Sequence, residues 1–218
     1  GLGALTLTDV DTVLGDISVT AGGLLTATDV VAAGTSKDVT LNTSTGGIIA
    51  TLVSAADSVI LTAAAGDITL GAVTATTGAA TIEATTGSIN DATDDTTADV
   101  TADGLITLTA ADEIGGAAPV GAGIDTRKAI ELASDSSVDA SSTSSTSAGD
   151  IVLSGLGALT LTEVDTADGN ISVTAGGLLT ATDVVAAGTN KDVTLNTSTD
   201  GIIATLVSTA DGNISVAA

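Results

Sequence analysis

The sequence predicts an all-β protein, a right-handed parallel β-helix (β-solenoid) with about 21 residues per rung and roughly ten rungs. Three observations lead to this prediction. The chain contains a long internal duplication, it repeats short strand-like segments at a nearly constant spacing, and its apolar residues are all small or branched aliphatics. Each observation is taken in turn below.

Residues 1–57 recur as residues 155–211, at a constant offset of 154 and without a gap. A duplication of this length and fidelity is typical of a tandem array. We therefore expect one continuous solenoid segment over residues 1–218, with 1–154 as a full repeat unit and 155–218 as the start of the next. Seven turns of 22 residues would fill 154 residues and would place the second copy in register with the first. The seven differences are Asp9/Glu163, Val13/Ala167, Leu14/Asp168, Asp16/Asn170, Ser36/Asn190, Gly46/Asp200 and Ala55/Thr209.

The composition excludes an ordinary globular core. Hydrophobic residues make up 44% of the chain, yet Phe, Trp, Tyr, Met and Cys are absent. Globular cores normally use aromatic side chains to fill volume, whereas a narrow core of stacked identical rungs can be filled by Ala, Val, Ile and Leu. A mean hydropathy of +0.54 also argues against disorder.

The charge balance restricts the partners. Four basic residues stand against 27 acidic ones, which gives a net charge of −23. Such a chain repels nucleic acid, because phosphate binding depends on clustered Lys and Arg, and it could attract divalent cations. We find neither an apolar run long enough to span a membrane nor a signal peptide, so an export signal is expected outside these residues.

A recurring five-residue pattern predicts the strands. A Gly-Asp or Gly-Asn turn is followed by apolar, polar and apolar residues, as in Gly15–Val19 (GDISV), Gly66–Leu70 (GDITL) and Gly169–Val173 (GNISV). Alternation with period two and β-branched residues after a turn is typical of a short strand.

The spacing of the first inward residues predicts two interleaved ladders with one shared period near 21 residues. After an irregular middle, a further series continues the pattern. The series are Leu5, Leu25, Ile49, Ile68, Ile89 and Ile106; then Ile17, Val39, Val59, Ala80 and Val100; and finally Ile130, Ile151, Ile171, Val193 and Ile214.

The middle of the chain is less regular. We interpret residues 110–149 as an irregular loop insertion, in which Ser134–Gly149 is a Ser/Thr-rich tract that we expect to form a long loop. This insertion contains the only proline, Pro119, and the basic pair Arg127 and Lys128.

Residues 104–134 (GLITLTAADEIGGAAPVGAGIDTRKAIELAS) and residues 149–189, which begin GDIVLSGLGALTLTEV, carry a more specific signal. They resemble the repeat region of giant haemagglutinin-like (filamentous-haemagglutinin-type) bacterial surface exoproteins, which contain GxIxLxA rungs and a DxIG…P…I(D)T insertion. The resemblance implies a secreted, right-handed β-helical rod that serves as a stalk or adhesin at the cell surface. The N-terminal secretion domain of such proteins is not in this sequence.

One cluster is a candidate metal site. Asp91, Asp94, Asp95, Asp99 and Asp103 fall within 13 residues and offer the carboxylate oxygens that Ca²⁺ prefers. They match neither the EF-hand loop nor the calcium-binding nonapeptide. The alternative is an acidic surface on an already acidic protein, so calcium is the only cofactor we consider.

Other chemistry receives less support. A polysaccharide-cleaving site needs paired carboxylates and usually aromatic platforms, and the chain has no aromatic residue and no histidine, so we predict no catalysis. Thr-x-Thr pairs such as Thr6/Thr8 and Thr26/Thr28 suggest an ice-binding face, but the array breaks after two rungs. Four Asn-x-Ser/Thr sequons, at Asn42, Asn170, Asn196 and Asn213, are interpreted as structural.

The sequence therefore predicts a structural repeat module of a long, secreted bacterial β-solenoid fibre or surface stalk, assembling with itself end to end or laterally. The alternative is an adhesin segment that binds a glycan or protein of a host or neighbouring cell through residues 110–149.

Overall fold

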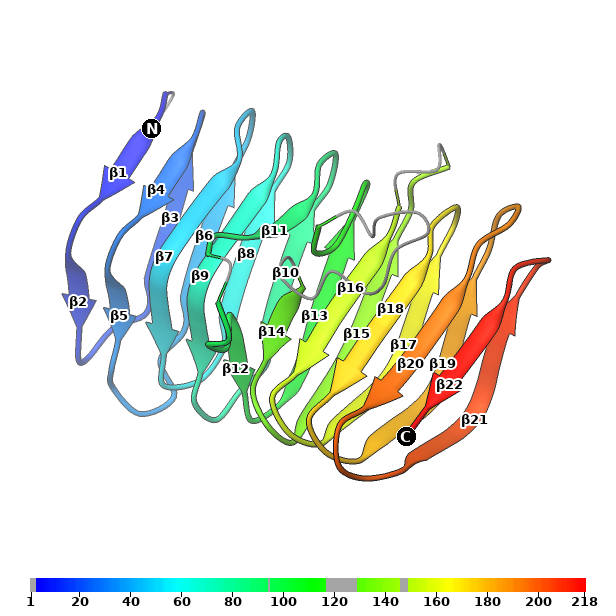
Figure 1. The fold of residues 1–218 in the computed structure, drawn as a ribbon. Coiled ribbons are helices and arrows are strands. Elements are labelled where there is room, and N and C mark those ends of the chain that lie inside the picture. The colour runs from blue at the N-terminus through cyan, green and yellow to red at the C-terminus, as the bar shows by residue number, and fades with distance from the viewer. Residues whose placement is uncertain (1–2, 94, 117–128, 146–148) are drawn as a thin grey trace.

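The computed structural model describes residues 3–93, 95–116, 129–145 and 149–218. All regular structure in these residues is β-strand, wound into a right-handed parallel β-solenoid of about nine turns. Figure 1 shows the chain advancing along one axis from the N-terminal to the C-terminal rung. This confirms the predicted fold class and is close to the predicted number of rungs.

The strands form two parallel sheets, and each turn of the coil contributes to both. Sheet 1 has 13 strands: β1 (Leu5–Leu7), β2 (Val10–Thr12), β4 (Leu25–Ala27), β5 (Val30–Ala32), β7 (Ile48–Ala55), β9 (Ile68–Ala75), β11 (Ile89–Asp91), β12 (Val100–Ala102), β14 (Ile130–Leu132), β16 (Ile151–Gly155), β18 (Ile171–Ala175), β20 (Val193–Thr197) and β22 (Ile214–Ala217).

Sheet 2 has nine strands. They are β3 (Ile17–Ala21), β6 (Val39–Thr43), β8 (Val59–Ala63), β10 (Ala80–Ala84), β13 (Leu105–Ala110), β15 (Ser136–Ser142), β17 (Leu159–Thr166), β19 (Leu179–Ala186) and β21 (Ile202–Thr209).

Alternating side chains of strands β1 to β21 point into one aliphatic core between the sheets. The largest fully buried side chains are all Leu or Ile, among them Leu25, Leu41 and Ile68. Each such side chain contributes roughly 1.5–3 kcal/mol on burial. Because equivalent rungs are about 4.8 Å apart, like side chains stack on like, and no aromatic side chain is needed to fill the space.

The first predicted ladder is correct at Leu5, Leu25, Ile68 and Ile89 but wrong at Ile49. Ile48 stands in the core column and is fully buried, whereas Ile49 is 36% exposed. Two adjacent isoleucines leave the parity of a strand ambiguous, and the pairing with the neighbouring rungs decides it. Outward Ile49 also interrupts the threonines on this face.

The prediction also assigns two residues to the wrong ladders. Val100 was predicted for the second ladder and Ile106 for the first, but Val100 pairs with Val73 in sheet 1 and Ile106 pairs with Ala80 in sheet 2. The cause is the segment between β11 and β12, because it leads the chain into a second short strand of sheet 1 before the chain crosses to sheet 2. Both strands pair with the single strand β9.

The last predicted series is wrong at one residue. Ile151, Ile171, Val193 and Ile214 pair in sequence as predicted, but Ile130 pairs with Leu153 rather than Ile151. The residue that continues the column is Ile114, which bridges Ile89 and Ile151.

Residues 134–149 are not one long loop. Ser136–Ser142 is strand β15, paired with β13 and β17 in sheet 2. Its inward positions alternate Ser136, Val138, Ala140 and Ser142, all buried. The two serines fit the core because their hydroxyls donate to backbone carbonyls, Ser136 to Ala133 and Ser142 to Asp112.

The second copy of the duplication lies half a turn away from the predicted position. From Leu5 the sheet 1 column takes six steps, through Leu25, Ile48, Ile68, Ile89 and Ile114, to Ile151. Leu159, the copy of Leu5, follows in sheet 2, so the 154-residue unit spans six and a half turns rather than seven. Every strand of the first copy therefore recurs in the opposite sheet.

The turns explain why the strand pattern begins with Asp or Asn. The side-chain oxygen of the residue before the strand accepts the N–H of its counterpart one rung further on. In the first copy Asp16 accepts from Asp38, and Asp38 from Ser58. Further along the chain Asp150, Asn170 and Asp192 accept in the same way, the last from Asn213 at 2.7 Å.

Candidate functional site

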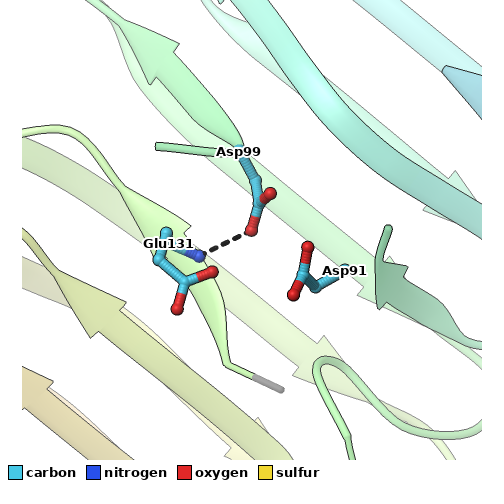
Figure 2. Close-up of side chains that lie close together, drawn as sticks. All are labelled: Asp91, Asp99 and Glu131. Carbon is cyan, nitrogen blue, oxygen red and sulfur yellow. Dashed lines mark hydrogen bonds between the residues drawn. The ribbon is translucent and has the colours of Figure 1, made fainter. Parts of the chain in front are cut away.

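Three carboxylates meet where the regular strand pattern is interrupted. Asp91 ends β11, Asp99 immediately precedes β12 and Glu131 is the middle residue of β14, all in sheet 1. One carboxylate oxygen of each lies within 4.8 Å of those of the other two. Figure 2 shows the three side chains turned toward one another, and we call them the carboxylate cluster.

The backbone places Asp99 and Glu131 on adjacent rungs. Val100 and Leu132, the residues that follow them, are Cα partners. The Glu131 N–H donates to the Asp99 Oδ2 at 2.8 Å, and the Asp99 N–H donates to the Glu131 carbonyl at 2.9 Å. The two carboxyl groups are therefore held one above the other by the rung spacing itself.

Burial governs the protonation of this pair. Asp99 is 2% exposed and Glu131 is 4% exposed. Loss of hydration, with a smaller contribution from the neighbouring charge of Asp91, raises the pKa of Asp99 to about 9. Burial likewise raises the pKa of Glu131 to about 7, with added repulsion from Asp91 and Asp95. The pair therefore retains a proton near neutral pH.

Of the four described residues among the five predicted as a calcium site, the structure brings two together. Asp91 and Asp99 belong to the carboxylate cluster, whereas Asp94 lies outside the described residues. Asp95 is exposed and accepts hydrogen bonds from Thr93 and Thr97, and the bonds from Thr97 lower its pKa. Asp103 lies in the turn between β12 and β13, where its N–H donates to Ala75.

Sequence reasoning missed Glu131, which follows Asp99 by 32 residues. A signal was present in the sequence, because an acidic residue directly precedes an inward aliphatic residue in several rungs of both sheets. The series is Asp9-Val10, Asp29-Val30, Asp99-Val100, Glu131-Leu132, Glu163-Val164 and Asp183-Val184. Aligning these dipeptides rung by rung would have paired Asp99 with Glu131.

A second, more exposed group of acidic side chains lies in sheet 2, on β15 and β17. Asp139 and Glu163 are Cα partners there, and Ser141 Oγ donates to Asp165 at 3.2 Å. Partial burial raises the pKa of Asp165, and the charges of Asp139 and Asp183 add to the effect. The carboxylate cluster differs from this group by its burial.

The carboxylate cluster could supply three oxygen ligands to a hard cation such as Ca²⁺, which takes six to eight. The remaining ligands would come from carbonyls or water. Because the Asp99–Glu131 pair holds a proton at neutral pH, cation binding would have to displace that proton. Calcium binding therefore stays a prediction, now for Asp91, Asp99 and Glu131.

The basic pair Arg127 and Lys128, considered for contact with an acidic polymer, lies outside the described residues. The two described lysines form ion pairs, Lys37 with Asp16 at 3.6 Å and Lys191 with Asp168 at 3.3 Å.

No family model, curated protein or solved structure matches this chain. Among the described residues, no helix is long and apolar enough to cross a membrane.

Proposed function

We propose that the chain is a structural repeat module of a long, secreted bacterial β-solenoid fibre or cell-surface stalk, and that it carries out no catalysis. The observation that carries the proposal is the continuity of both sheets through the two copies of the duplication. A unit that can follow itself on the same axis can be repeated to give length.

The mechanism is mechanical. Backbone hydrogen bonds between rungs run along the rod axis, and the aliphatic core resists bending. Six and a half rungs at about 4.8 Å give a length of roughly 31 Å for each 154-residue unit. The net charge of −23 keeps neighbouring rods soluble and apart.

An extracellular setting is supported by the resemblance of residues 104–189 to haemagglutinin-like surface exoproteins. Self-assembly, end to end or side by side, is the partner interaction that a uniform rod favours, because its terminal rungs present unpaired backbone groups.

Electron microscopy of the full-length gene product tests this proposal. We expect thin rods whose length changes by about 31 Å when one 154-residue unit is deleted or added. Deleting half a unit is the matched control, because it would join strands of unequal length and disrupt the rod. Compact particles without rod-like extension would overturn the proposal.

The second candidate is an adhesin segment that binds a surface glycan or protein through residues 110–149. It is favoured by one observation: Ile114, at the start of this region, is joined to its neighbouring rungs only by isolated bridges, to Ile89 and Ile151. A glycan array probed with the native chain and with residues 117–128 replaced by Gly and Ser would test it. Binding that survives the replacement would count against this candidate.

A further inference from the structure

At the middle of the rod, successive rungs are paired less extensively in sheet 1 than in sheet 2. In sheet 1, β12 and β14 share one residue pair, Val100 with Leu132. Ile114 connects its two neighbouring rungs only through isolated bridges to Ile89 and Ile151. Regular rungs of the same sheet are joined more extensively, by seven pairs between β7 and β9 and by five between β16 and β18.

Sheet 2 is continuous at the same level. Six pairs join β13 to β15, from Leu105–Ser137 to Ala110–Ser142. Seven pairs join β15 to β17, with one register shift between Val138 and Asp139. Among the described residues, the loss of pairing is therefore confined to one side of the rod.

The sparse pairing of sheet 1 follows from the strand lengths. In the first copy, sheet 1 contains the eight-residue strand β7 and sheet 2 contains five-residue strands such as β6. In the second copy, sheet 1 contains five-residue strands such as β18 and sheet 2 contains the eight-residue strand β19. The middle rungs must convert one arrangement into the other, and sheet 1 does so with short, split strands.

A solenoid is stabilised by the interfaces between neighbouring rungs, so it opens first where an interface has the fewest interactions. We infer that the middle of the rod is a one-sided hinge, in which β12 and β14 separate along sheet 1 while β13, β15 and β17 stay paired. The hinge would let a stiff stalk bend toward the side of sheet 2 without breaking. This inference deepens the proposed mechanical function and rests on it only for its purpose.

Acidic side chains line the opening edge. Asp99 and Glu131 face each other across the single-pair interface, with Asp91 beside them and Asp95 close enough to repel Glu131. Like charges that ionise there repel at short range. Two backbone hydrogen bonds oppose the opening, from the Asp99 N–H to Glu131 and from the Ala133 N–H to Val100.

Amide hydrogen exchange followed by NMR tests the hinge directly. The amides of Asp99 and Ala133 should exchange at least about tenfold faster than buried amides of β13 and β15 at the same level, because local opening exposes only one sheet. Equal protection of the two sheets would overturn the inference, and so would faster exchange in sheet 2.

A disulfide staple provides the second measurement, since the chain has no cysteine of its own. Thr101→Cys with Ala133→Cys, one residue beyond the single pair, should abolish the excess exchange. The matched control, Ser54→Cys with Thr74→Cys, joins Cα partners in a regular rung and should leave it unchanged. An excess that persists in the stapled hinge would contradict the inference. Exchange is measured on the isolated chain, so failure of the fibre proposal would not alter this result.

Discussion

Residues 1–57 and 155–211 have nearly the same sequence, but their equivalent strands lie in opposite sheets. Ile17–Ala21 forms β3 in sheet 2, and its copy Ile171–Ala175 forms β18 in sheet 1. The local sequence therefore specifies a strand and its inward side chains but not the sheet to which the strand belongs. The number of half-turns that precede the strand decides that.

The substitutions between the copies show how a charge pair is conserved during the change of sheet. Lys37 pairs with Asp16, which is replaced by Asn170 in the second copy. The equivalent Lys191 pairs instead with Asp168, which replaces the exposed Leu14. The partner moves by two residues, and the lysine keeps a carboxylate.

The strongest test of the equivalence lies in the core. Leu41 and Leu195 are copies of each other, both fully buried but in opposite sheets. Replacing either with Ala should lower the free energy of unfolding by about 2–5 kcal/mol, through lost burial and the cavity left behind. Denaturant titration measures both variants. A loss at one site alone would show that the two sheets are not equivalent environments.

Calcium should act only at the middle of the rod. At about one hundred times its Kd it should raise the free energy of unfolding by about 2.7 kcal/mol. Glu131→Gln should abolish the rise. Glu163→Gln, in the more exposed acidic group of sheet 2, should not. Thermal unfolding with and without calcium measures this effect. An equal response in native and Glu131→Gln protein would remove the carboxylate cluster as the ligand.

The pH dependence of stability should also originate at the middle. Between 3.8, the ordinary pKa of Asp99, and about 9 in the folded state, the unfolded chain has released a proton that the folded chain keeps. Raising the pH through this window therefore lowers the free energy of unfolding.

Asp99→Asn should reduce that slope and stabilise the protein by at least about 1 kcal/mol at pH 8, since one pKa unit corresponds to about 1.4 kcal/mol. Asparagine can still accept the hydrogen bond from the Glu131 N–H. Unfolding midpoints from pH 5 to 8 measure the change, with Glu163→Gln as the control. A slope unchanged in Asp99→Asn would refute the buried, protonated state of Asp99.

The smallest effect concerns the two lysines. Lys191→Met should cost more than Lys37→Met, because the Lys191 side chain is 10% exposed and the Lys37 side chain is 28% exposed. Both losses should stay below about 1 kcal/mol, as expected for ion pairs near the surface. Double-mutant cycles with Asp168 and Asp16 separate the pairs. A larger coupling energy at Lys37 would reverse the comparison.

Much of the fold could be predicted from the sequence, because aliphatic residues recur about every 21 positions and turns are marked by Gly, Asp and Asn. The column from Ile17 to Ala80 and the series from Ile151 to Ile214 are correct. The phase of the second copy could not be predicted, because it depends on how many half-turns the irregular middle contributes. Strand β15 was missed because its serines resemble a loop until their hydrogen bonds are known.

The candidate site was predicted in part for a related reason. Asp91 and Asp99 are close in sequence, so their proximity was expected. Glu131 reaches them only because the chain completes a whole turn, through sheet 2 and back, between Asp99 and that residue. Contacts between rungs depend on the register, and the register in the middle cannot be read from a regular spacing.

The half-turn itself can be tested by one cross-link. Thr107 and Asp139 are outward-facing Cα partners in sheet 2, at the step that carries the chain from the first copy toward the second. Cysteines at these positions should form a disulfide rapidly, since parallel partners lie within bonding distance. A second pair, Thr101→Cys with Asp139→Cys, would join only if β15 belonged to sheet 1. The account predicts the first disulfide and not the second, and the reverse result would mean that the repeat spans a whole number of turns.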